Sequence, residues 1–217
     1  MANQKVDPIP DNMSIEEASE FWDTHSVANY LSHVVQLEYI PGAVRMIRPT
    51  YLSALRKIYV RLNDGGVNWA ITGSLGFALQ GVPVEVHDID IQTDEAGAYE
   101  IERRFSEFII RKVAFSSADK IRSHFGGLMI DGVKVEIMGD IQKRLADGTW
   151  EARVDLKCHQ RMVSVEGMGV PVLSLAYEYQ AYLKLGRIDR AEMLRKWLHG
   201  ERHSGIFGCF RKSGGFG

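Results

Sequence analysis

The chain has 217 residues, a formal net charge of −2 and 45% hydrophobic residues, an ordinary balance for one globular domain or one domain with appendages. The near-neutral charge gives no global field that would favour nucleic acid or an acidic membrane. Two cysteines exclude a disulfide framework, no apolar run approaches the ~18 residues of a membrane span, and the first residues lack the apolar stretch of a signal peptide, so we expect a cytoplasmic protein.

Residues 1–45 predict an N-terminal helical extension. Ser14 and Glu17 stand at the spacing of a capping box, and apolar residues then recur at helical spacing between Phe21 and Val34. The stretch also resembles short segments of small bacterial antitoxins. It is therefore expected to offer a docking segment for a protein partner.

Residues 46–170 predict one domain of the α+β (mixed α/β) class, in which helices flank a small mixed sheet. Apolar periodicity and turn residues define its elements. They are, in chain order, a helix within 48–66, a strand and turn over 67–74, a short helix over 75–81, a strand over 86–93, a helix over 94–109 and a hairpin over 124–140. The pair Asp131-Gly132 in this last segment is one that a type I′ hairpin turn prefers.

The end of the chain predicts two further parts. Residues 171–200 are expected to form a helical hairpin, with Ser174 as the N-cap of its first helix and Gly186 as the break. Residues 201–217 are rich in glycine without a period and are expected to be a flexible tail.

Two aspartates stand one residue apart in the apolar stretch "VHDIDIQT". Because side chains alternate along a strand, Asp88 and Asp90 share one face, whereas Ile89 and Ile91 point into the core. Two like charges about 7 Å apart raise each other's pKa and cost free energy unless a cation lies between them. Such a triplet also occurs by chance as two solvated aspartates, so its meaning depends on the residues around it.

A third carboxylate, Glu136, lies in the second strand of the predicted hairpin. If this strand lies beside the Asp88–Asp90 strand, three carboxylates converge, and such an all-oxygen cluster suits Mg²⁺. Upstream, the turn "TGSLG" follows a strand and opens a helix. Gly73 would let a phosphate come close, and the hydroxyl and N–H of Ser74 could bind a phosphate oxygen.

Gly73-Ser74, then Asp-x-Asp, then a glutamate on a later strand together resemble the signature of the DNA polymerase β-like nucleotidyltransferase superfamily. The resemblance covers residues 66–140, and it is closest to small prokaryotic members, the antibiotic nucleotidyltransferases and nucleotidyltransferase-like toxins. It implies Mg²⁺-dependent transfer of a nucleoside monophosphate from an NTP, expected to be ATP, to an acceptor hydroxyl, with release of pyrophosphate.

The resemblance also implies roles for single residues. Asp88 and Asp90 would bind Mg²⁺ together with the nucleotide, and Glu136 would bind a second metal or act as general base on the acceptor hydroxyl. Gly73 and Ser74 would hold the β- and γ-phosphates. The third carboxylate of the family is often Asp, so Asp131 and Asp140 are the fallbacks for Glu136, although the turn explains Asp131 better.

Two basic residues are further candidates for the nucleotide site. On a strand, Arg122 and His124 share one face, where they could contact phosphate or acceptor; the competing reading is a salt-bridged surface arginine. Lys184 lies where family members often have a lysine facing the triphosphate, and a solvated helix face is an equal alternative. Arg187 carries less weight, and alternation places His87 away from the metal.

A second class of function remains open: a non-catalytic nucleotide-binding or toxin–antitoxin interaction module on the same fold. Release of pyrophosphate would separate the transferase from this module and from a metal-dependent phosphatase or nuclease. The sequence does not identify the acceptor, which could be an antibiotic-like small molecule, a protein or an RNA.

Overall fold

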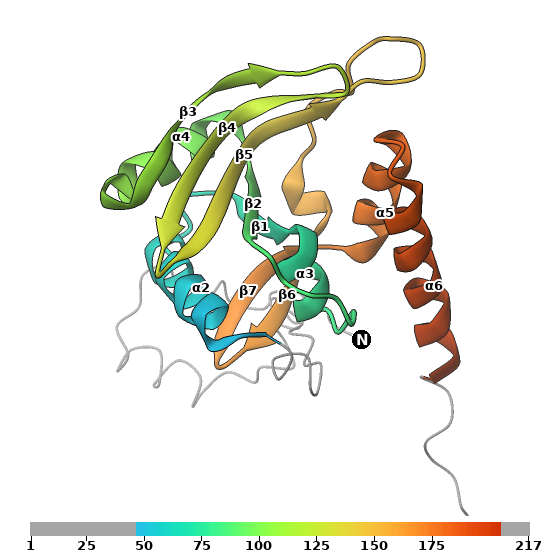
Figure 1. The fold of residues 1–217 in the computed structure, drawn as a ribbon, viewed down its shortest axis with the longest axis horizontal. Helices are drawn as coiled ribbons and strands as arrows, with labels where there is room; N and C mark the ends of the chain where they lie inside the picture. The colour runs from blue at the N-terminus through green and yellow to red at the C-terminus, as the bar shows by residue number, and fades with distance from the viewer. Residues whose placement is uncertain (1–46, 205–217) are drawn as a thin grey trace, which may run out of the picture. The chain divides into compact units, whose positions relative to one another are not determined.

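A seven-stranded mixed sheet runs through residues 47–204, the part of the chain that the computed structural model describes (Figure 1). Its strands lie in the order β3-β4-β5-β2-β1-β7-β6. The pairs β2–β5 and β1–β7 are parallel, and the other four pairs are antiparallel. The strands are β1 (Trp69–Thr72), β2 (Ile89–Thr93), β3 (Ile109–Ser117), β4 (Ile121–Ile130), β5 (Val133–Lys143), β6 (Gln160–Val165) and β7 (Met168–Leu173). This sheet confirms the predicted mixed α/β class.

Two helices, α2 (Pro49–Leu62) and α4 (Glu95–Arg104), cover one face of the sheet. The predicted periodicity of the first helix is confirmed, since Tyr51, Leu55 and Ile58 are buried on its inner side. The strand side chains that meet the two helices in the main core include Ile89, Ile91, Val135 and Ile137. Because side chains alternate along a strand, the residues between these four point to the opposite face of the sheet.

The predicted order of strand, helix, strand, helix and hairpin is observed. The short helix α3 (Gly73–Leu79) begins directly after β1, and the hairpin consists of β4 and β5. Asp131 and Gly132 have φ angles of +53° and +77°, as both central positions of a type I′ turn require. The sequence analysis did not identify β3, β6 and β7.

Two helices follow the sheet, α5 (Leu175–Lys184) and α6 (Ile188–Ser204). Ser174 caps α5 by accepting the Tyr177 N–H at 3.3 Å, and Gly186, at φ +70°, separates the helices, so the helical hairpin is confirmed. It packs on the end of α3 through Phe77 and Tyr182, whose ring centroids are 6.0 Å apart. None of the helices between residues 47 and 204 is long and apolar enough to cross a membrane.

Two predicted parts lie outside the described residues. The N-terminal helical extension over residues 1–45 falls entirely on residues 1–46, and most of the predicted tail falls on residues 205–217. Both stay predictions, as does the division of the chain at residues 46, 171 and 201.

Helix α4 approaches β5 so closely at Gly139 that a side chain does not fit. A Cβ added there would lie 2.7 Å from the Ala98 Cβ and 2.8 Å from the Asp94 carbonyl oxygen. We expect Gly139→Ala to lower the free energy of unfolding by ~1–3 kcal/mol, the range for overpacking a core, measured by urea denaturation. Gly200→Ala is the control, because a Cβ there meets nothing within 4 Å. An equal effect of both substitutions would show that α4 can move away from the sheet freely.

Candidate active site

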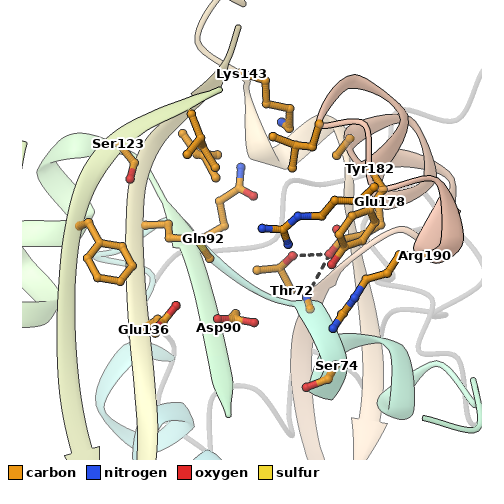
Figure 2. Close-up of a pocket in the computed structure, with 18 of the residues that line it drawn as sticks. Thr72, Ser74, Asp90, Gln92, Ser123, Glu136, Lys143, Glu178, Tyr182 and Arg190 are labelled. Atoms are coloured by element: carbon orange, nitrogen blue, oxygen red, sulfur yellow. Dashed lines mark hydrogen bonds between the residues drawn. The ribbon is translucent and has the colours of Figure 1, made fainter. Parts of the chain in front are cut away.

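A pocket of about 430 Å³ lies on the face of the sheet opposite α2 and α4 (Figure 2). Its size is in the range of small-molecule sites. Side chains of the sheet, the β1–α3 turn, α5 and α6 line it. Its acidic, basic and histidine lining residues are Asp88, Asp90, Glu136, Glu178, His87, Lys143, Arg187 and Arg190.

The predicted neighbourhood of the two acidic strands is confirmed. Strands β2 and β5 are parallel, and Asp90 and Glu136 are Cα partners in their register. Figure 2 shows the two carboxylates side by side, with Ser74 and Arg190 on the other side of the pocket. Asp88 precedes β2 by one residue and lines the same pocket. All three acidic residues of the sequence signature therefore face one space.

The Asp90 carboxyl is the group whose pKa these neighbouring carboxylates and its burial raise. Burial raises its pKa to about 7, with further contributions from the negative charges of Asp88, Glu136 and Glu178, while Lys134 acts in the opposite direction. Lys134 also donates a hydrogen bond to Glu136. A buried carboxyl among three other carboxyls binds either a proton or a cation near neutral pH.

The β1–α3 turn brings glycine backbone directly against Asp90. Gly73 has φ +65°, and a Cβ added to it would lie 2.2 Å from Asp90 Oδ2. A non-glycine residue would therefore be strained and would also displace the carboxylate. The adjacent Ser74 is 7% exposed and its hydroxyl oxygen accepts the His87 N–H at 3.5 Å. Its own hydroxyl hydrogen remains available to a ligand oxygen.

Glu178 is a fourth acidic residue that the sequence analysis missed. It projects from α5, is 5% exposed, and accepts hydrogen bonds from the Thr72 hydroxyl and from the Gly73 N–H, the latter at 3.2 Å (Figure 2). The Gly73 N–H is thus occupied by Glu178, so the polar groups of this turn that remain for a ligand are those of Ser74. An acidic residue on the apolar side of a helical pattern was the signal that could have identified Glu178.

The structure does not bring the two predicted basic residues, Arg122 and Lys184, into the pocket. Arg122 and His124 do share one face of β4, but their neighbours Ser123 and Phe125 face the pocket instead. Arg122 donates to Gln142 Oε1 at 3.0 Å and lies over the Trp150 ring.

Lys184 lies at the end of α5 and pairs with Glu151 outside the pocket. The expectation for His87 also needs correction. It lines the pocket because regular strand alternation begins only at Ile89. The assignments of Arg122 and Lys184 to the nucleotide remain predictions without support from the geometry.

Three other cations line the pocket, and two of them come from α6 and the residue before it. Arg187 and Arg190 both place their guanidinium groups 5.9 Å from the centroid of the Tyr182 ring. Their i,i+3 spacing at the start of a helix could have indicated that both face the pocket, although only Arg187 was considered as a candidate for the nucleotide site.

The third cation, Lys143, reaches the pocket through an irregularity in β5. Asp140 has φ +46°, and the pairing of β4 with β5 shifts register between Arg122 and His124. The extra residue reverses the alternation, so that Ile141 and Lys143 face the same pocket as Glu136. Lys143 is 3% exposed and pairs with Glu151 Oε2 at 3.2 Å.

Neither fallback for the third carboxylate lies in the pocket. Asp131 bonds Ser53 and Lys57 at the hairpin turn, and Asp140 pairs with Arg153 at 2.8 Å on the other face of the sheet. Glu136 is therefore the third carboxylate that the geometry favours.

The donor set fits a magnesium site that the nucleotide completes. Within residues 47–204, no three His, Cys, Asp or Glu side chains form a preassembled metal cage. Mg²⁺ rarely uses such a cage, because it binds through one or two carboxylates together with substrate phosphates and water. Asp88 and Asp90 are the pocket residues that could supply such oxygens, and a bound cation would lower the raised pKa of Asp90.

A known protein family matches the part of the chain that contains this site. The family model of aminoglycoside-2''-adenylyltransferases matches residues 54–195, a range that contains the sheet and every ionisable residue of the pocket. A search of curated proteins found no match.

Solved structures of similar chains include one high-identity relative. TM1012 from Thermotoga maritima, described there as an inferred nucleotidyltransferase, is 72% identical, with a TM-score of 0.64, over 71% of this chain and 96% of that chain. ANT(2")-Ia with adenylyl-2"-tobramycin is 15% identical over 70% of this chain and 92% of that chain, with a TM-score of 0.46. Lincomycin-bound LnuA is 12% identical over 69% of this chain and 97% of that chain, with a TM-score of 0.42. The last two likenesses are too distant to support an argument about the site.

The family match covers well over half of the chain, and the high-identity relative is itself described as a nucleotidyltransferase. The chain therefore belongs to the aminoglycoside-2''-adenylyltransferase family, a family of nucleotidyltransferases.

Proposed function

We propose that this protein is a magnesium-dependent adenylyltransferase that transfers AMP from ATP to an acceptor hydroxyl and releases pyrophosphate. The observation that supports this most directly is the parallel register that sets Asp90 beside Glu136, next to the Gly73 turn. ATP as the donor follows from the family to which the chain belongs.

In this proposal, Asp88 and Asp90 hold Mg²⁺ with the triphosphate. Bound Mg²⁺ would neutralise phosphate oxygens and so favour attack at the α-phosphorus. Gly73 gives the Asp90 carboxylate its place against the turn, beside the phosphates, and the Ser74 hydroxyl donates to a β- or γ-phosphate oxygen. Most of the rate then comes from positioning and from electrostatic stabilisation of the transferred group.

The reaction step requires a proton acceptor for the attacking hydroxyl. The acceptor oxygen forms a bond to the α-phosphorus while the bond from that phosphorus to the bridging oxygen of the β-phosphate breaks, and pyrophosphate leaves. Glu136 accepts the hydroxyl proton if it is the general base. Its alternative role, as ligand of a second metal, stays open in this proposal, because its position beside Asp90 suits both.

We assign the contacts to the triphosphate to Lys143, Arg187 and Arg190 in place of Arg122 and Lys184. All three line the pocket. Arg190 lies on the side opposite Asp90 and Glu136 (Figure 2), and Lys143 comes from the end of β5. Arginine donates two hydrogen bonds in a fixed fork to phosphate oxygens, so the two α6-side residues suit this task.

The acceptor class that we propose is a hydroxyl-bearing, antibiotic-like small molecule. The family description names an aminoglycoside as acceptor, and this supports the class but not the compound. A protein or an RNA acceptor would appear as label transferred from ATP to a macromolecule. An ATP-dependent reaction and a chain with two cysteines also fit the cytoplasmic location that we propose.

Asp90→Asn should reduce pyrophosphate release by at least about 100-fold while the protein stays folded, because it removes a charge that holds the metal and nucleotide. The measurements are pyrophosphate release with a panel of acceptors and circular dichroism of the variant. Asp140→Asn is the matched control, since Asp140 lies in β5 but outside the pocket. Equal activity of Asp90→Asn and the wild type in the presence of Mg²⁺ would remove the assignment.

The stability of the metal-free protein should fall as pH rises through about 7. The pKa of Asp90 is about 7 in the folded protein and 3.8 in the reference state, so the folded state binds the extra proton between these values. Its contribution to stability is complete below about pH 4 and is lost above about pH 7. Melting temperatures in EDTA at about pH 5.5 and about pH 8 measure this. The decrease should be smaller in Asp90→Asn, and identical profiles would contradict the raised pKa.

Arg190→Met should raise the dissociation constant of ATP by about 10-fold, because it removes a charge-assisted contact worth roughly 1.4 kcal/mol or more. Calorimetric titration of ATP with Mg²⁺ measures this constant. Arg122→Met is the matched control and should bind ATP like the wild type, since Arg122 lies against Trp150 outside the pocket. The reverse ranking would restore Arg122 as the phosphate ligand.

A further inference from the structure

Glu178 is a buried carboxylate that the proposed reaction does not use. It lies on α5 beside the buried side chains of Leu175, Ala181 and Tyr182, and it lines the pocket together with Lys143 and Arg190, whose positive charges act on it. Burial of a carboxylate costs free energy unless hydrogen bonds compensate it, and an apolar residue would pack there at lower cost. The presence of Glu178 therefore points to a task that depends on its oxygen atoms.

Glu178 accepts two hydrogen bonds from the same turn. One carboxylate oxygen, Oε1, accepts the Thr72 hydroxyl and the Gly73 N–H. Thr72 is the N-cap residue of α3, yet its side chain makes no capping bond to that helix. Its hydroxyl instead donates to a residue more than a hundred positions later in the chain. A helix of the C-terminal pair thus holds the start of α3 from outside.

The same turn sets the position of the Asp90 carboxylate. Thr72 and Asp90 are Cα partners across β1 and β2. Asp90 Oδ2 occupies the space beside the Gly73 Cα, at 2.2 Å from the point where a Cβ would be. This space exists only while Gly73 keeps its left-handed conformation, with φ +65°. A change in the turn would therefore move the carboxylate or close its space.

We propose that Glu178 is a positioning residue, which fixes the Thr72–Gly73 turn from α5 and thereby orients the Asp90 carboxylate for the metal–nucleotide complex. The inference rests on the proposed function, because the task of Asp90 is taken from it. Helix α5 packs against α6, which begins beside Arg187 and carries Arg190. One helix pair consequently places two of the three cations of the pocket and orients the central carboxylate on the sheet.

Two pairs of variants test the contact. Thr72→Val removes the hydroxyl and keeps the side-chain shape, whereas Thr72→Ser keeps the hydroxyl. Glu178→Leu removes the acceptor, whereas Glu178→Gln keeps an acceptor oxygen for the turn. The Thr72 pair keeps the inference testable if Glu178→Leu does not fold, and thermal melting identifies that case.

The first measurement is made without metal or nucleotide. Hydrogen exchange by NMR reports the protection of the Gly73 N–H, with the Ala70 N–H of β1 as internal reference. We expect about 10-fold faster relative exchange at Gly73 in Glu178→Leu and near wild-type exchange in Glu178→Gln, since a lost hydrogen bond of ~1.4 kcal/mol corresponds to a factor of ten. Unchanged exchange at Gly73 in Glu178→Leu would overturn the contact itself.

The second measurement is the Mg²⁺ concentration that half-saturates binding of α,β-methylene-ATP, followed by calorimetry. It should rise by about 3-fold in Thr72→Val and about 10-fold in Glu178→Leu, and stay near the wild-type value in Thr72→Ser and Glu178→Gln. A residue needed only for packing would lower the melting temperature and leave this concentration unchanged in the folded protein, which would overturn the positioning role.

The two possible failures can be distinguished. If the wild type binds the analogue without any dependence on Mg²⁺, the proposed function is wrong and the metal role of Glu178 falls with it. If the wild type depends on Mg²⁺ and all four variants match it, the inference about Glu178 alone is wrong.

Discussion

The parallel pairing of β2 with β5 is the constraint on which the site depends. Its register sets Asp90 directly beside Glu136, although two like charges in adjacent strand positions repel each other. The sheet tolerates this repulsion because the alternate residues Ile91 and Ile137 are fully buried beneath helices on the other face. Apolar packing on one face thus maintains, on the other face, an arrangement of charges that would not form in an isolated hairpin.

The opposite wall of the pocket comes from elements that are distant in sequence. The residues after β7 contribute Glu178, Arg187 and Arg190, which bring both an acid and two bases to the sheet. The acid bonds the backbone turn, whereas the bases remain at the pocket surface. On this wall the acidic side chain of Glu178 therefore holds the backbone turn, whereas the basic side chains of Arg187 and Arg190 face the space for the ligand.

The sequence was informative where local rules decide the outcome. Asp88 and Asp90 line one pocket as predicted, although Asp88 precedes β2, and the turn preference of Asp131-Gly132 predicted the hairpin and with it the strand of Glu136. Periodicity did not identify β3, an edge strand whose exposed and buried residues follow no regular alternation. It also could not decide which face of β4 meets the pocket, so Arg122 was predicted to line it, whereas Ser123 does. Glu178 was missed because its partner, Gly73, is 105 residues away in the sequence, and no local pattern indicates a contact of that range.

The irregularity at Asp140 has a consequence for how one strand can serve a binding site. In a regular strand every second side chain faces the ligand, and the first residue decides whether these are the odd-numbered or the even-numbered positions. The additional residue in β5 shifts the pocket-facing positions from even-numbered to odd-numbered residues. Glu136 near one end of the strand and Lys143 at the other therefore reach the same ligand space. A single strand can in this way contact opposite charges on one bound molecule. The same residues paired without the irregularity would turn the neighbouring Gln142 or Arg144 toward the pocket in place of Lys143.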